Sequence, residues 1–178
     1  MKLLRLKLLL GILLLPLAAL ATDSDFNGRW RLDAEQSSAL DGWSAMDLCI
    51  EINGSEVTLQ HDMRWRSTRV TETNVVNTRE SVNLSNYFRV EQRHMAVYSP
   101  KKSVTPVTAG WLDNERTLRL EALVPVEVSQ GDATIRIYSE YRLEEGGKKL
   151  TLIELHSTRN RPLIYIFRKL SADDTSRP

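Results

Sequence analysis

The chain has 178 residues, with 24 Lys and Arg against 23 Asp and Glu, and 42% of its residues are hydrophobic. A nearly balanced charge without a basic stripe argues against a nucleic-acid-binding protein. The single cysteine, Cys49, excludes a disulfide within the chain, so stability has to come from the burial of apolar side chains.

The N-terminal segment has the layout of a signal peptide. Three positive charges precede an apolar run over 8–18 and a small-residue site that ends at Ala21. The run is shorter than the roughly 20 apolar residues that span a bilayer, which disfavours an uncleaved membrane anchor. We therefore expect 1–21 to be removed and the mature protein to be periplasmic or secreted, without a transmembrane anchor. Its net charge would be 21 − 23 = −2.

From residue 28 onward, apolar residues recur two positions apart between turn residues, a pattern typical of half-buried β-strands. A short helix is predicted over 34–40, capped by Asp33. Asn53-Gly54 predicts a tight hairpin between two of the strands. The predicted tail, 171–178, is short, polar and expected to be disordered. Further strands are expected over 46–53, 57–65, 68–76, 81–90, 94–99, 118–124, 133–143, 149–157 and 163–170.

These elements predict one all-β domain over 22–170. We expect an antiparallel up-and-down β-barrel of about eight to ten strands, with one short helix after the first strand. A β-sandwich is the alternative architecture. Closure favours the barrel, because pairing the last strand with the first removes the exposed edges that a sandwich has to protect.

Two stretches resemble secreted bacterial lipocalin-like domains. The segment Phe26 to Asp33 matches the family's opening, a phenylalanine followed by Gly-x-Trp-x-Leu and an acidic residue or asparagine, and Gly147 to Leu152 resembles its Gly-Lys-x-Leu-Thr turn and strand. The resemblance implies a barrel that can hold an internal cavity, and it implies no chemistry.

The same resemblance implies how the barrel closes. In such folds the tryptophan of Gly-x-Trp packs against an arginine from the end of the sheet, which here would join Gly28 and Trp30 to Arg168. Arg161 and Lys169 are the alternatives. Arg161 precedes a proline in an expected turn, and Lys169 lacks the planar group that stacks well on an indole. An exposed arginine without a tryptophan contact is the competing interpretation of Arg168.

No catalytic signature is present in the sequence. It contains no Gly-x-Ser-x-Gly elbow, His-Glu-x-x-His helix or Gly-x-Gly-x-x-Gly loop. The three histidines, at 61, 94 and 156, lack metal-ligand spacing. We therefore expect neither an enzyme nor a metal or other cofactor.

Polar residues interrupt faces that are predicted to point inward. His61 alternates with apolar residues in one strand, and Glu154 and His156 continue the apolar face of another. A histidine and a carboxylate in an apolar cavity would orient a ligand. The predicted ligand contacts are therefore His61, Met63, Trp65, Glu154 and His156. A wet barrel rim or a structural hydrogen-bond network is the competing interpretation.

The leading functional prediction is an exported barrel that binds an apolar small molecule in its interior. The alternative is a non-enzymatic envelope interaction or inhibitor module whose barrel is filled by side chains. An enzyme that uses the polar intrusions is the least favoured interpretation. An interior cavity on the order of several hundred Å³ would favour ligand binding, and a filled interior would favour the module.

Overall fold

A computed structural model describes residues 25–38, 43–85, 87, 103–144 and 146–178. Within these ranges the chain forms ten antiparallel strands in one sheet and no helix. None of the described segments is a helix that is long and apolar enough to cross a membrane. The predicted signal peptide, 1–21, lies outside the described residues.

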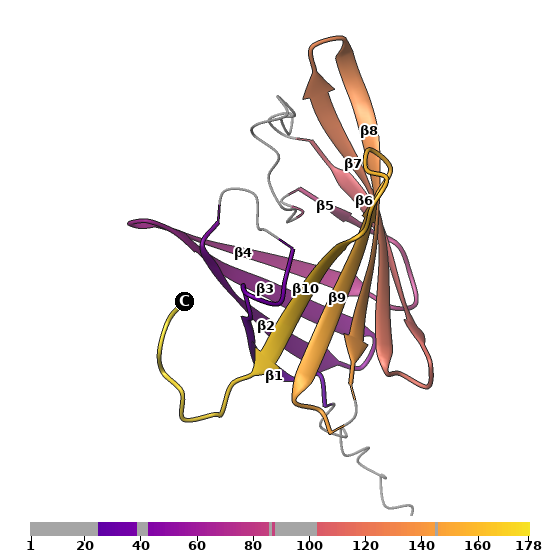
Figure 1. The fold of residues 1–178 in the computed structure, drawn as a ribbon. Helices are drawn as coiled ribbons and strands as arrows, with labels where there is room; N and C mark the ends of the chain where they lie inside the picture. The colour runs from indigo at the N-terminus through magenta and orange to yellow at the C-terminus, as the bar shows by residue number, and fades with distance from the viewer. Residues whose placement is uncertain (1–24, 39–42, 86, 88–102, 145) are drawn as a thin grey trace, which may run out of the picture.

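The sheet has an up-and-down topology that closes through its chain ends. The strands are β1 Gly28–Leu32, β2 Ala45–Asn53, β3 Glu56–Trp65, β4 Thr68–Asn77, β5 Val82–Leu84, β6 Thr105–Leu112, β7 Thr117–Val128, β8 Gly131–Leu143, β9 Lys149–His156 and β10 Leu163–Lys169. Their order is β4-β3-β2-β1-β10-β9-β8-β7-β6-β5. The sheet curls until β4 lies against β5 and β6, so the barrel is nearly closed (Figure 1). The predicted all-β up-and-down barrel is confirmed.

Alternation along the strands places the apolar side chains inside the barrel. In β3, Val57, Leu59 and Met63 are buried while their neighbours in the chain are not. The largest fully buried side chains are Trp30, Tyr165, Phe26 and Phe167. Burying an aliphatic or aromatic side chain of this kind contributes about 1.5–3 kcal/mol, so these faces supply the stability that a disulfide cannot.

The barrel closes as predicted between the first and last strands, but through a different cation. Trp30 pairs with Lys169 in the β1–β10 ladder, and the Lys169 Nζ lies 5.1 Å from the centroid of the Trp30 ring. Arg168 is 70% exposed, with its Nε 3.4 Å from Asp33 Oδ2. The assignment of Arg168 to Trp30 is wrong because alternation turns Arg168 to the outer face, while Lys169 shares the inner face of β10.

The structure explains both residues of the Gly-x-Trp pair. Gly28 has a φ of +123°, and a Cβ added there would lie 3.3 Å from Lys169 Cε. The Trp30 Nε1 donates a hydrogen bond to the Phe26 carbonyl oxygen at 2.9 Å. A side chain at 28 would therefore be strained and would crowd the lysine stem that covers the indole.

The predicted helix after the first strand is wrong in its described part. Residues 34–38 form turns and bends. The Ser37 Oγ accepts a hydrogen bond from the Ile166 N–H at 2.9 Å, and the Ser38 Oγ accepts one from the Ile164 N–H at 2.9 Å. Serine hydroxyls compete with helical hydrogen bonds in this way, and here they tie the segment to β10.

Two other expected elements differ from the sequence prediction. The β2–β3 hairpin forms, but Asn53 pairs with Glu56, so its two central residues are Gly54 and Ser55. Gly54 has the positive φ, +61°, that such a turn needs at its first central position. Of the expected strand 81–90, the described residues form a strand only at β5. The expected strand 94–99 lies outside the described residues.

The outer face of β1 and β2 carries a buried carboxylate with two arginines. Asp47 is 1% exposed, and its oxygens lie 3.1 Å from Arg29 Nε and 2.8 Å from Arg31 Nε. The C-terminal residues 171–178, which were expected to be disordered, make defined contacts with this face. Arg29 Nη1 donates to the Asp174 carbonyl oxygen at 2.9 Å, and both arginines donate to the Ser176 carbonyl oxygen.

Candidate functional site

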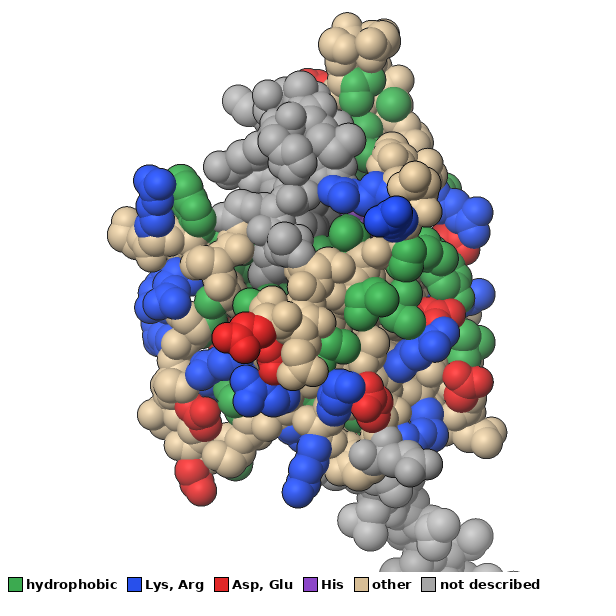
Figure 2. Space-filling view, in the orientation of Figure 1, with side chains coloured by type: hydrophobic (Ala, Val, Ile, Leu, Met, Phe, Trp, Pro, Cys, Tyr) green, Lys and Arg blue, Asp and Glu red, His purple; other side chains and the backbone are tan. Residues whose placement is uncertain are grey.

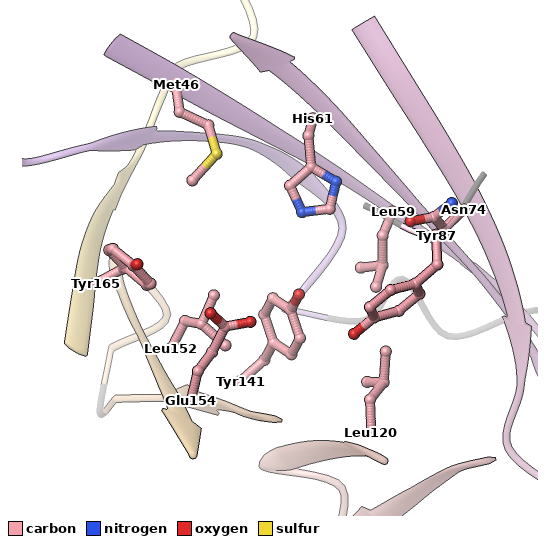
Figure 3. Close-up of a pocket in the computed structure, with 10 residues that line it drawn as sticks. All are labelled: Met46, Leu59, His61, Asn74, Tyr87, Leu120, Tyr141, Leu152, Glu154 and Tyr165. Atoms are coloured by element: carbon pink, nitrogen blue, oxygen red, sulfur yellow. The ribbon is translucent and has the colours of Figure 1, made fainter. Parts of the chain in front are cut away.

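A small cavity lies inside the barrel, where polar side chains from separate strands converge (Figure 3). Its volume is about 10 Å³, close to the space of one water molecule. The cavity is lined by Met46, Leu59, His61, Asn74, Tyr87, Leu120, Tyr141, Leu152, Glu154 and Tyr165.

His61 is placed in the cavity wall by the alternation of β3. It follows Leu59 and precedes Met63 on the inner face, and only 3% of it is exposed. Burial lowers the pKa of His61 to about 3, although the neighbouring charge of Asp62 raises it slightly. The imidazole is therefore neutral at neutral pH and has one donor and one acceptor nitrogen.

Glu154, in β9, places a carboxylate on the side of the cavity opposite His61. Its Oε1 accepts a hydrogen bond from the Ser139 Oγ at 3.2 Å, and its Oε2 lies 3.5 Å from His156 Nε2. All three residues are buried, with Glu154 8% exposed. Figure 3 shows the carboxylate directed between Tyr141 and Leu152, into the cavity.

Three tyrosines complete the polar part of the wall. Burial, with the negative charge of Glu154, raises the pKa of Tyr87, while a hydrogen bond with Ser139 opposes the rise. Burial first, and then the charges of Tyr87 and Glu154, raise the pKa of Tyr141 well above its ordinary value. Both phenols therefore keep their protons at neutral pH. Tyr165, from β10, is fully buried.

The structure brings together two of the five predicted ligand contacts. His61 and Glu154 line the cavity, and His156 lies behind Glu154. Met63 is buried in the core without lining the cavity. Trp65 is on the predicted face but lies at the end of β3, where it is 42% exposed and stacks 4.7 Å from the Arg66 guanidinium. Whether these residues contact a ligand stays a prediction.

Sequence reasoning missed four of the polar or aromatic residues that line the cavity. Tyr141 and Tyr165 follow the same inward alternation as their apolar neighbours, so the strand pattern could have found them. Asn74 lies on the inward face of β4, where polar residues blur the alternation. Tyr87 falls within the expected strand 81–90 but lies in no strand of the structure, so the alternation predicted there does not place it inside the barrel.

The outer surface offers a second hollow, of about 340 Å³, beside β8 and β9, lined by Arg136, Tyr138, Leu155, His156 and Ser157. Leu155 and Ile164 are 48% and 40% exposed.

On the face drawn in Figure 2, cationic and anionic side chains are interspersed among apolar ones. This mixture gives no single-sign surface for a polyanion on that face, in agreement with the balanced composition.

Comparisons with known proteins give no family. No protein-family model and no curated protein matches the chain. One similar solved structure is a fatty-acid-binding protein in brain tissue of Drosophila melanogaster, which is 12% identical with a TM-score of 0.49 over 80% of this chain and 98% of that chain. An abundant heat soluble (SAHS) protein from Ramazzottius varieornatus is 11% identical, with a TM-score of 0.48 over 84% and 98%.

Proposed function

We propose that this protein is an exported, non-enzymatic barrel that binds a small, largely apolar molecule in its interior, with the polar end of the molecule at His61, Tyr141 and Glu154. The convergence of these side chains on one cavity carries the proposal. They come from β3, β8 and β9, and the remaining walls include Met46, Leu120 and two further leucines. Small-molecule sites typically combine apolar walls with a few placed polar groups of this kind.

The volume of the cavity sets a condition on binding. A space of about 10 Å³ admits no organic molecule until a side chain moves. Tyr87 is the side chain we expect to move, because it belongs to no strand and its displacement breaks the hydrogen bond with Ser139 but no sheet hydrogen bond. Its ring lies between Asn74 and Leu120 in Figure 3, so its departure would enlarge the cavity from one side.

The volume is far below the one on the order of several hundred Å³ that a ligand-binding interior is expected to have, so the barrel as it stands favours one alternative function. If Tyr87 stays in place, the barrel is filled, and the protein would act through its outer surface as an envelope interaction or inhibitor module. The exposed apolar residues Leu155 and Ile164 lie on that surface. The two functions predict different affinities for an apolar probe when Tyr87 is replaced by alanine.

Binding of a neutral apolar fluorophore, N-phenyl-1-naphthylamine, to the mature protein distinguishes the two functions. We expect the wild type to enhance its fluorescence, and Tyr87→Ala to bind it at least about threefold more tightly, since removing the ring opens the cavity. Leu155→Ala, on the outer face, is the matched control and should bind like the wild type. If neither wild type nor Tyr87→Ala binds the probe, and native mass spectrometry of protein from its own host shows no bound species, the filled-barrel function is correct.

Export rests on the charge and hydropathy pattern of residues 1–21. The exported protein should have an intact mass that corresponds to a start at Thr22. A mass that includes residues 1–21 would contradict cleavage at this site.

A further inference from the structure

The charges around the interior cavity differ from those that a fatty acid would need. Its described lining residues include one carboxylate, from Glu154, and neither lysine nor arginine. Among all the described residues that are buried, the polar and charged ones likewise include neither. We infer that the ligand's polar end is a hydrogen-bond donor, best an ammonium group and otherwise a hydroxyl, rather than a carboxylate. This inference rests on the proposed interior binding.

Glu154 supplies the acceptor for such a donor. Its Oε1 is engaged by Ser139, whereas its Oε2 accepts no hydrogen bond from the described residues and has His156 Nε2 at 3.5 Å. An ammonium group at this oxygen would form a charge-assisted hydrogen bond, which is about twice as strong as a neutral one. A hydroxyl would also satisfy the oxygen, but without the charge.

A carboxylate at the same place would be disfavoured. It would put a second negative charge beside Glu154 in an interior that screens charge poorly, and two close carboxylates do not both stay ionised. Lys169, at the barrel closure, lies over the Trp30 ring and donates a hydrogen bond to the Asp25 carbonyl oxygen. Arg29 and Arg31 lie on the outer face with Asp47.

Among the described residues, His61 and His156 are interior histidines, and they bear on this charge in different ways. Burial holds the pKa of His61 near 3, so this imidazole stays neutral and offers no cation to a carboxylate ligand. His156 faces Glu154 directly and would neutralise it when protonated. Tyr87 and Tyr141 also face Glu154, and both stay neutral. The test is run at about pH 8, where an alkylamine is charged and an alkanoate is ionised.

Three ligands with the same eight-carbon chain test the inference: octylamine, octanol and octanoate. Each is titrated into the mature protein at about pH 8, and its dissociation constant is measured by displacement of N-phenyl-1-naphthylamine and by calorimetry. We expect octylamine to bind most tightly and octanoate most weakly, with at least about a tenfold difference between them. Glu154→Gln should abolish the preference of octylamine over octanol and change octanol binding by less than about threefold.

Glu121→Gln is the matched control, because Glu121 lies on the outer face of β7, 2.7 Å from the Arg136 Nε, and its replacement removes the same charge. It should keep the wild-type order. Unfolding midpoints of both variants separate loss of binding from loss of fold, and if Glu154→Gln does not fold, the wild-type order alone decides. Octanoate binding as tightly as octylamine overturns the inference and leaves interior binding intact. If Glu154→Gln and Glu121→Gln lose the preference for octylamine over octanol equally, the inference is overturned too. Failure of all three ligands and of the fluorophore overturns the proposed function as well.

Discussion

The neutral state of His61 makes a quantitative prediction about stability and pH. The pKa of this imidazole is about 3 in the folded protein against an ordinary value of 6.5, and burial is the main cause. The folded-state pKa is the lower one, so below about pH 6.5 the unfolded chain binds the proton and the folded barrel resists it. The stabilisation is complete above pH 6.5 and is lost as the pH falls towards 3.

The expected loss follows from the size of this difference. One pH unit corresponds to about 1.4 kcal/mol, so about 2 kcal/mol of the free energy of unfolding should disappear between pH 8 and pH 5 through His61 alone. Urea unfolding of the wild type and of His61→Gln at both pH values measures it. The wild type should lose about 2 kcal/mol more than the variant on acidification, because glutamine has no proton to gain.

Histidine NMR gives an independent check. The His61 ring signals should not titrate between pH 8 and pH 5 in the folded protein. If the two proteins lose the same stability on acidification, or if the His61 signals titrate near pH 6.5, then His61 is accessible to water. The reasoning that places it in a closed interior would then be refuted.

Five substitutions test the closure and the outer carboxylate by urea unfolding. Trp30→Ala should cost about 3–5 kcal/mol, whereas Lys169→Ala should cost about 0.5–1 kcal/mol and Arg168→Ala less than about 0.5 kcal/mol. A larger cost for Arg168 than for Lys169 would contradict the β10 orientation. Gly28→Ala should cost about 1–3 kcal/mol through its positive φ, and an unchanged midpoint would mean that the backbone relaxes. Asp47→Asn should cost about 2–3 kcal/mol and expose the C-terminal residues to carboxypeptidase. Unchanged digestion would mean that this carboxylate does not hold the C-terminal residues in place.

The strand pattern was enough to predict the barrel, because a period of two fixes which side chains point inward. It places His61 and Glu154 on the interior faces, and the need to protect sheet edges predicts that the last strand pairs with the first. The error at Arg168 came from preferring the chemistry of arginine over the alternation. The same pattern puts Lys169, and not Arg168, on the face of Phe167.

What the sequence could not predict depends on packing between distant segments. The cavity volume depends on how side chains from most of the strands pack against one another, and no local sequence pattern predicts it. Tyr87 enters the interior from outside the strands, so periodicity does not apply to it. Trp65 has the predicted orientation, but its exposure depends on where β3 ends relative to the rest of the barrel.

The two buried carboxylates among the described residues are satisfied in different ways, and the difference supports the proposed interior site. Asp47 has two arginines within 3.1 Å, together with a covering tail, so its charge is balanced by the chain itself. Glu154 is buried without a cation-bearing lysine or arginine among the described lining residues, with one hydroxyl donor and a histidine 3.5 Å away. A buried carboxylate is costly unless it is paired, and Asp47 shows how this fold pairs one. The incomplete pairing of Glu154 is therefore the strongest reason to seek the ligand inside the barrel and to expect a donor at its polar end.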